Sequence, residues 1–220
     1  MKMKLLFLCG TSLLLSSFHS SAQTDAYHKG NLLLNISEGT TWADYSTGDA
    51  ASSQRFTDGG TTGTRDPLFI EYALTNKIGL GLTMGGDIFN VNPAKYYGFS
   101  TIDKTVKTTT SELTLDGDYH FFVTKKLDLS AYVSAGLFSL TMKGRTDELN
   151  YNYAASGSIF RIGTRARYYV YKRFGVLGSF SAYTANANPD DCNPSATTAK
   201  SYSTTIRGIA LEFGVCLRVF

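Results

Sequence analysis

The amino-acid sequence predicts an all-β protein, an eight-stranded antiparallel up-and-down transmembrane β-barrel that follows a cleaved signal peptide. Three observations support this prediction. Apolar and polar residues alternate with period two over eight segments of the chain. The connections between these segments are short and long in turn. None of the four prolines interrupts a predicted strand, where its missing N–H would break the hydrogen-bond ladder.

The first 22 residues have the features of a secretory signal peptide. A positively charged start, MKMK, precedes a short apolar core, and small residues end the segment at Ala22. We therefore predict a signal peptide over 1–22 and a single barrel domain over 23–220. Cleavage removes two lysines and lowers the formal net charge from +3 to +1. Because the mature chain has no basic stripe, we expect no nucleic-acid partner.

The predicted strands are joined by three short turns and four long loops. The strands cover 31–45, 67–75, 78–91, 108–124, 127–143, 157–171, 174–188 and 204–220. The short turns are Asn76-Lys77, Lys125-Lys126 and Lys172-Arg173, and the long loops are 46–66, 92–107, 144–156 and 189–203. Short turns at one end and long loops at the other are typical of barrels in the bacterial outer membrane. An even number of strands leaves both termini at the short-turn end.

Each predicted strand has one apolar and one polar face. In the fourth strand the apolar face comprises Leu113, Leu115, Gly117, Tyr119, Phe121 and Val123, and the polar face comprises Glu112, Thr114, Asp116, Asp118, His120 and Phe122. Period two alone does not say which face points inward. Apolar faces of about 10–12 residues suit a tilted spanning strand, and glycine-rich polar faces suit a crowded eight-stranded lumen. We therefore expect the apolar faces to contact lipid.

Aromatic residues support the same orientation. Tyr72, Phe121 and Tyr168 each lie five positions before the second residue of a short turn, and all three are on apolar faces. Aromatic side chains at one height are expected at a membrane interface. We predict that these three residues and Trp42 are interfacial aromatics.

The chain from Asn31 to Phe220 resembles the small eight-stranded outer-membrane barrels of the OmpA/OmpX type. The resemblance rests on the signal peptide, the alternating segments, the loop asymmetry and the terminal phenylalanine. It implies the outer membrane of a Gram-negative-type cell, contact with outer-membrane lipid and lipopolysaccharide, and assembly by the barrel-insertion machinery. Such barrels commonly have apolar residues two and four positions before the last phenylalanine. Here Arg218 and Cys216 take those places, so either Phe220 lies past the last strand pair or the assembly signal is atypical.

Charged residues on the polar faces are expected to meet inside the barrel. These are Glu71, Asp87, Glu112, Asp116, Asp118, Arg161, Arg165, Arg167, Glu212 and Arg218. An unpaired buried charge is costly, so we expect a hydrogen-bonded network. We interpret this network as structural filling in preference to a selectivity or gating device, because eight strands leave room for side chains and no open pore.

The sequence gives little support for catalysis, metal binding or a cofactor. After cleavage the chain has two histidines, His28 and His120, far apart in the sequence, and no G-x-S-x-G motif. We therefore expect no catalytic residue, no metal ligand and no cofactor. The remaining cysteines, Cys192 and Cys216, are predicted at opposite ends of the barrel, too far apart for a disulfide.

The expected function is a structural or surface-interaction role without an open pore. The four long loops could contact an external ligand or surface partner. Two alternatives stay open at this point. One is a soluble, secreted, lipocalin-like barrel that binds an apolar ligand, although Gly39-Thr40-Thr41-Trp42 lacks the Gly-x-Trp spacing of lipocalins. The other is a lipid A-modifying barrel enzyme.

Overall fold

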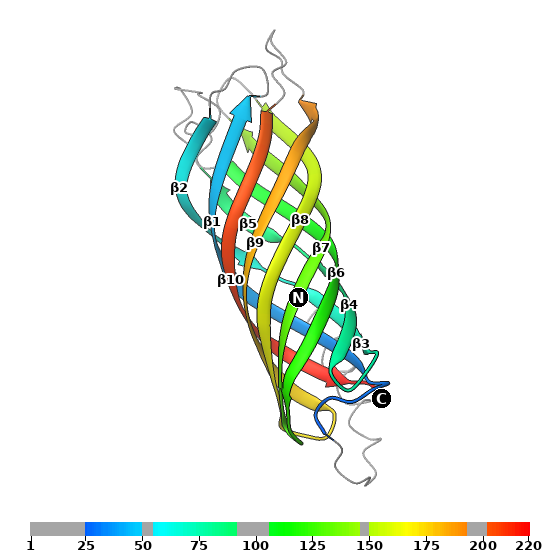
Figure 1. Ribbon diagram of the computed structural model, residues 1–220. Coiled ribbons are helices and arrows are strands. Elements are labelled where there is room, and N and C mark those ends of the chain that lie inside the picture. Colours follow the sequence, from blue (N-terminus) through cyan, green and yellow to red (C-terminus); the bar gives the residue numbers. More distant parts are fainter. Residues whose placement is uncertain (1–24, 50–54, 92–105, 146–149, 193–201) are drawn as a thin grey trace.

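The computed structural model describes residues 25–49, 55–91, 106–145, 150–192 and 202–220, and these form a closed antiparallel barrel (Figure 1). The strand segments are β1 (Leu32–Asp49), β2 (Arg55–Arg65), β3 (Leu68–Ala73), β4 (Ile78–Gly85), β5 (Asp87–Val91), β6 (Val106–Val123), β7 (Leu127–Arg145), β8 (Asn150–Tyr169), β9 (Phe174–Cys192) and β10 (Tyr202–Arg218). No helix in the described part of the chain is long and apolar enough to span a membrane.

The ten segments make a ring of eight strands, as the alternation predicts. Consecutive segments from β6 to β10 pair as antiparallel neighbours, and β10 closes the ring on β1 from Leu33↔Arg218 to Asp49↔Tyr202. β2 and β3 both pair with β1 and form one wall strand. β4 and β5 both pair with β6 and form the next. The predicted eight-stranded up-and-down barrel is confirmed.

Two wall strands are interrupted at the same height. The second strand breaks at Asp66 and Pro67, where proline has no N–H for the ladder, and the third breaks at Gly86. The two breaks face each other, since the Asp66 N–H donates to the Gly86 carbonyl at 3.3 Å. A Cβ atom at Gly86 would lie 2.1 Å from the Thr110 carbonyl oxygen, so this approach requires glycine. The unbroken strand predicted over 78–91 is therefore wrong at this residue.

The barrel is longer than the sequence predicts. The segment 46–66 was expected to be a loop, but β1 continues to Asp49 and β2 occupies Arg55–Arg65. β7 and β8 likewise extend into 144–156, β9 extends to Cys192, and β6 begins at Val106. Serine, threonine and glycine on these extensions reduce the contrast between faces, which explains why they read as loop. The remaining residues of the four predicted loops lie outside the described part.

The three short turns fall where the sequence places them. Each is closed by a backbone hydrogen bond, from Thr75 N–H to the Ile78 carbonyl (3.1 Å) and equivalently from Thr124 to Leu127 (2.7 Å) and from Tyr171 to Phe174 (3.0 Å). In the first turn the Thr75 hydroxyl also accepts from the N–H groups of Lys77 and Ile78. Thr124 makes the same pair of contacts in the second. The lysines of these turns therefore lie at the end of the barrel.

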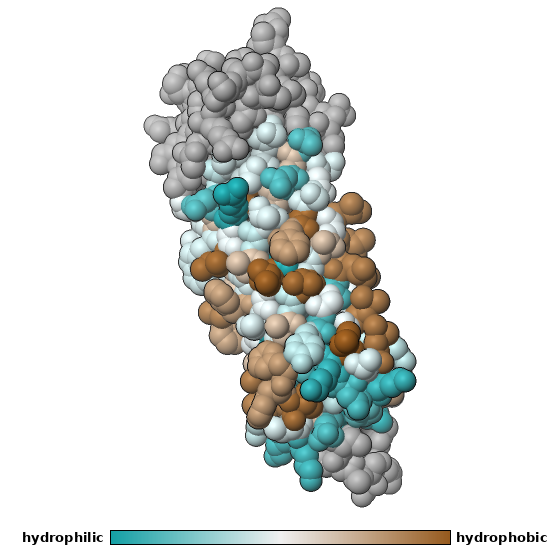
Figure 2. All heavy atoms as spheres, in the orientation of Figure 1, coloured by the Kyte–Doolittle hydropathy of each residue, from teal (hydrophilic) through white to brown (hydrophobic). Residues whose placement is uncertain are grey.

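In the lower part of the barrel, where the short turns lie, apolar side chains are on the outside and charged side chains are on the inside. Most outward-facing side chains there are apolar and exposed, including Leu115 (58 %) and Phe213 (64 %), with Glu38 of β1 as an exception, whereas the inward-facing side chains include many that are charged and buried. Figure 2 shows the hydrophobic side chains gathered over the middle and lower part of the molecule, with hydrophilic ones at the lower tip. A soluble barrel has the opposite arrangement. The apolar exterior is a lipid-facing belt, so the alternative of a soluble lipocalin-like barrel is wrong.

Above this belt the inside and the outside exchange character. Outward-facing residues become polar, as at Thr109, Ser139 and Thr184. The interior instead holds a buried apolar cluster, composed of Ala43, Tyr45, Phe89, Phe138, Leu140, Ala155, Ile159, Tyr183, Ala185, Ala187 and Ile206. This is the pattern of a water-surrounded barrel. The change in character therefore marks where the membrane ends and the wall continues into solvent.

A bulge in β6 changes the predicted faces at one place. The β6–β7 register shifts between His120 and Phe122, so Phe121 is the extra residue. Phe121 and Phe122 are both exposed on the outside (52 % and 48 %), and Val123 packs against interior residues. The sequence assigned Phe122 inward and Val123 outward, and both assignments are wrong because the bulge resets the alternation. The bulge widens the aromatic surface near the turns.

The chain segment before β1 closes the short-turn end of the barrel. The Ala26 N–H donates to the Thr124 carbonyl (2.7 Å), and the ring of Tyr27 enters the barrel, where it is 2 % exposed. The C-terminus lies at this same end (Figure 1), and the Phe220 carbonyl accepts from the Asn31 side-chain amide at 2.9 Å. Phe220 follows the end of β10 at Arg218, and its side chain is 62 % exposed. The first of the two predicted alternatives, a phenylalanine past the last strand pair, is the one observed.

Candidate functional site

Ionisable side chains fill the interior of the belt region. Four arginines, seven carboxylates and one histidine are buried there. They form three stacked clusters, each built around an arginine, which we name the upper (Arg65), middle (Arg165) and lower (Arg167) clusters. Each of these three central arginines contacts at least two carboxylates.

The upper cluster surrounds Arg65 of β2. Its guanidinium contacts Glu112, Asp87 (3.4 Å) and Glu212 (2.8 Å), which come from three different wall strands. Arg161 adds a second cation, 2.9 Å from Glu112 and from the Ser181 hydroxyl. Hydroxyl groups of Thr41 and Ser179 satisfy further carboxylate oxygens. The cluster ties β2, β5, β6, β8 and β10 together across the lumen.

The middle cluster holds Arg165 between aromatic rings and acids. Its guanidinium carbon lies 3.7 Å from the ring centroids of both Phe69 and Tyr132. Its N–H groups donate to Asp116 (2.9 Å) and Asp118 (2.7 Å). Cation–π stacking fixes the plane of the guanidinium while the carboxylates fix its edge, so this arginine has little freedom to move.

The lower cluster contains Arg167 and His120. Arg167 bridges Asp128 (2.8 Å) and Glu71 (2.6 Å). His120 contacts the same two carboxylates, with Nδ1 2.6 Å from Asp128 and Nε2 2.8 Å from Glu71. The Tyr27 ring stacks on the imidazole at 3.4 Å between centroids. Burial and the nearby Glu71 carboxylate raise the pKa of the Tyr27 hydroxyl, which keeps it protonated.

Glycines of β4 allow the lower cluster to form. Glu71 lies on β3, and β4 separates it from β6, which carries His120. A Cβ atom at Gly79 of β4 would lie 2.0 Å from Glu71 Oε1, and one at Gly81 would lie 2.3 Å from the Phe69 ring. The bare backbone of β4 therefore lets both side chains reach over a neighbouring strand. The glycine-rich sequence GLGL at 79–82 has this structural reason.

Arg218 departs from the expected network. It lies at the short-turn end of β10 and contacts backbone carbonyls, those of Asp25 (2.6 Å), Ala26 (3.4 Å) and Lys172. No carboxylate among the described residues lies within ion-pair distance of it. The expectation that Arg218 pairs with lumen acids is wrong, because the segment before β1 occupies the barrel end and supplies carbonyl acceptors instead.

The other nine predicted lumen charges face inward and take part in the clusters: Glu71, Asp87, Glu112, Asp116, Asp118, Arg161, Arg165, Arg167 and Glu212. Sequence reasoning missed Arg65, Asp128 and the contacts of His120. Arg65 was assigned to a loop because the segment 46–66 is rich in glycine, serine, threonine and aspartate. Asp128 has the inward parity of Ser130, Tyr132 and Ser134, and that parity could have identified it.

The predicted interfacial aromatics all point away from the lumen. Tyr72, Phe121 and Tyr168 are exposed near the short turns (47–52 %). Trp42 is 44 % exposed and lies next to the polar residue Asp44, where the outer surface changes character. The aromatics therefore occur at both edges of the apolar belt, as expected at the two interfaces of a membrane.

Little space is left inside the belt region. A cavity of about 20 Å³ lies between the upper and middle clusters, beside Arg65, Arg165 and Glu212. This volume holds about one water molecule. The apolar cluster closes the barrel above the ionic clusters, and Ala26 and Tyr27 fill the end below them. The interior is thus occupied along its length in the described residues.

Comparisons with known proteins identify the fold. No family model matches the chain, and no curated protein matches it in sequence. Among solved structures, the outer membrane protein OprG from Pseudomonas aeruginosa superimposes with a TM-score of 0.57 at 13% identity, covering 90% of this chain and 99% of that one. The chain has the fold of a small outer-membrane β-barrel. This fold confirms the predicted resemblance, and the apolar belt is the exterior that a membrane-spanning barrel requires.

Two further structures give weaker superpositions. AlkL, solved in DMPC lipid bilayers, has a TM-score of 0.49 at 14% identity, with 92% of this chain and 96% of that chain covered. The outer membrane protease OmpT from Escherichia coli has a TM-score of 0.47 at 11% identity, with 92% and 99% covered.

Proposed function

We propose that this protein is a closed outer-membrane barrel with a structural or surface-interaction role, and that it is neither a pore nor an enzyme. The observation that carries the proposal is the occupied interior. Three ionic clusters, an apolar cluster above them and the segment before β1 below them stand in the way of any solute. Moving charged side chains out of such a network is costly, so steady conduction is unfavourable.

The wall above the belt supports a role at the cell surface. β1, β2 and β5 to β10 raise a polar exterior beyond the apolar belt, and this part of the wall includes the described residues of the segments predicted as loops, 46–66, 92–107, 144–156 and 189–203. A stiff, extended wall is a suitable support for contacts with an external ligand or partner. Lipopolysaccharide and outer-membrane lipid are the proposed partners of the belt and its rim, and the barrel-insertion machinery is the proposed partner during assembly.

The non-enzymatic assignment rests on the lack of a suitable surface constellation among the described residues. The buried histidine is enclosed by Tyr27, Glu71 and Asp128 at the short-turn end, out of reach of a substrate at the external face. A lipid A-modifying activity would need reactive groups at the outer rim. Comparing the lipid A mass spectra of cells with and without the protein tests this point, and we expect identical spectra.

The absence of transport is tested by conductance. We expect the mature protein to give no steady current in a planar bilayer, because the ionic clusters leave a cavity with room for about one water molecule. Brief and rare openings are compatible with a rearranging charged network. Sustained ion-selective currents whose selectivity reverses on Arg165→Glu would contradict the proposal, since they would give the network a role in permeation.

A further inference from the structure

The lower and middle clusters contain more negative than positive charge. Glu71, Asp116, Asp118 and Asp128 face Arg165 and Arg167, so the formal charge is −2 when His120 is neutral. The side chains of these four carboxylates are wholly excluded from solvent. An uncompensated charge in such a place is costly. The interior therefore favours added positive charge, from a proton or from a bound cation.

One carboxylate oxygen in this region lacks a partner. Asp118 Oδ1 accepts hydrogen bonds from Arg165 and Ser130, but Asp118 Oδ2 is buried and has no hydrogen-bond partner among the described residues. Native structures rarely leave a buried carboxylate oxygen without a donor or a cation. This oxygen marks a position where something positive is expected.

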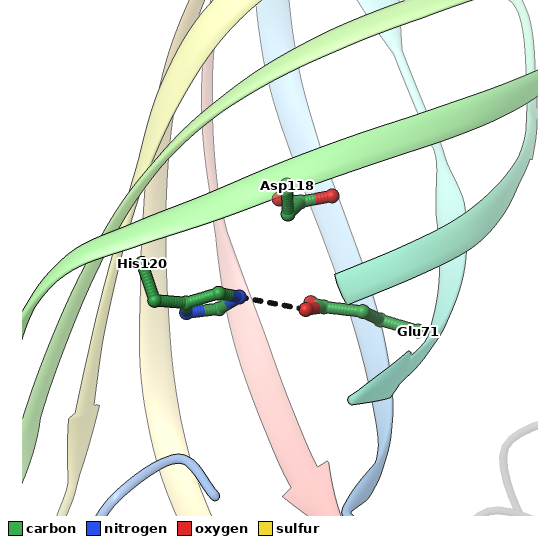
Figure 3. Close-up of side chains that lie close together, drawn as sticks. All are labelled: Glu71, Asp118 and His120. Atoms are coloured by element: carbon green, nitrogen blue, oxygen red, sulfur yellow. Dashed lines mark hydrogen bonds and ion pairs between the residues drawn. The ribbon is translucent and has the colours of Figure 1, made fainter. Parts of the chain in front are cut away.

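Asp118 lies close to Glu71 and His120. Figure 3 shows the three side chains close together, with His120 and Glu71 pointing toward each other and joined by a hydrogen bond. Glu71 comes from β3, and the other two come from β6. Each offers a ligand atom, and these atoms lie within 4.8 Å of one another. Two ligand atoms at about 2.0–2.2 Å from a zinc ion are at most about 4.4 Å apart, so small side-chain shifts suffice. We propose that Glu71, Asp118 and His120 form a binding site for one divalent transition-metal ion.

The surroundings of His120 fit a metal ligand. Its Nδ1 lies 2.6 Å from Asp128 Oδ1, so a neutral ring with the proton on Nδ1 directs the Nε2 lone pair toward Glu71 and Asp118. A carboxylate at the far nitrogen of a ligating histidine fixes its tautomer and orientation. Tyr27 stacks on the ring at an interplanar angle of 15° and holds its plane. Asp128 and Tyr27 are positioning residues in this arrangement.

The ligand set also indicates the class of metal. One imidazole nitrogen with two carboxylates suits Zn²⁺, Co²⁺ and related transition ions better than Ca²⁺ or Mg²⁺, which prefer oxygen ligands alone. A dication would cancel the formal charge of −2 in the two clusters. The sequence predicted no metal site because the two histidines are distant from each other. The triad uses one histidine and a carboxylate that reaches it across Gly79.

The test is metal content after folding. Because the site is buried, the untagged mature chain is refolded in detergent with Co²⁺ and then desalted, and folding is verified by the heat-modifiable gel shift. We expect one Co²⁺ per folded chain, with a visible absorption band. Asp118→Asn and His120→Gln should lose at least tenfold in affinity. Asp128→Asn should lose about 10–100-fold, as for other groups that orient a ligating histidine.

Two matched variants keep the result specific. Glu212→Gln removes a buried carboxylate from the upper cluster, and His28→Asn removes the half-buried histidine outside the site, so both should bind Co²⁺ as the parent does. Folded parent without bound Co²⁺ overturns the proposal, as does equal loss in Glu212→Gln and Asp118→Asn. If a variant of Glu71, Asp118 or His120 does not fold, the Co²⁺ content of the folded parent protein decides. The parent protein refolded with Co²⁺ should unfold at a higher temperature in the gel-shift assay than the parent refolded with a chelator. An unchanged unfolding temperature counts against the site.

Discussion

Replacing Arg167 with methionine is expected to lower the free energy of unfolding by roughly 3–5 kcal/mol. Its guanidinium lies between Glu71 and Asp128, and all three side chains are fully buried. Methionine fills similar space but leaves the Glu71 and Asp128 carboxylates with His120 as the ring that still bridges them. Removing one member of a buried ion pair leaves a buried charge without its partner, and the cost of removing that charge from water is then no longer offset.

Urea unfolding in metal-free lipid vesicles measures this effect. The chain has a single tryptophan, Trp42, at the edge of the apolar belt, so its fluorescence reports loss of the inserted state. The matched control is Arg207→Met, which removes an exposed arginine from the outside of β10 and should change stability by no more than about 0.5 kcal/mol. Equal changes in the two variants would mean that the ionic clusters contribute nothing specific.

Leu115→Arg is expected to cost roughly 2–4 kcal/mol, because an arginine at the bilayer midplane must leave water. Leu115 is 58 % exposed on the outside of β6, within the apolar belt. Thr109→Arg is the matched control on the same strand and the same face, six residues nearer the external end. There the exterior is polar, and the expected cost falls to about 0–1 kcal/mol.

The two substitutions are compared by the same vesicle unfolding assay. A difference between them measures the depth of the belt along β6, since strand, face and introduced side chain are identical. Should Leu115→Arg fold and insert as well as Thr109→Arg, the outside of β6 would not contact hydrocarbon at Leu115. The assignment of lipid and lumen faces would then fail.

Alternation predicted the strands well where lipid and lumen impose opposite chemistry on the two faces. In β10, Leu211, Phe213 and Val215 alternate with inward residues such as Glu212, and the sequence identified this strand and its faces. In β2 the outward Thr62 and Thr64 are as polar as parts of the interior, so no contrast marks the strand. The sequence therefore took it for a loop and missed Arg65, the centre of the upper cluster.

The candidate site was partly accessible to sequence reasoning for a related reason. Strand parity predicted that Glu71, Asp118 and Arg167 share the interior. It did not predict which of them touch, because contacts across the lumen depend on strand tilt and on gaps such as the one at Gly79. The sequence also did not predict the bulge at Phe121 or the apolar cluster above the belt, because both reverse the rule that the polar face points inward.

The wall exchanges its inside and outside character at the upper edge of the belt. Nitroxide labels along β10, in a background with Cys192→Ser and Cys216→Ser, test it in lipid vesicles. We expect labels at Leu211 and Phe213 to be accessible to oxygen dissolved in the bilayer and shielded from a water-soluble nickel complex. Labels on the same face at Ser203 and Arg207 should show the opposite. Nickel access at Phe213, or oxygen access without nickel access at Ser203, would contradict the account.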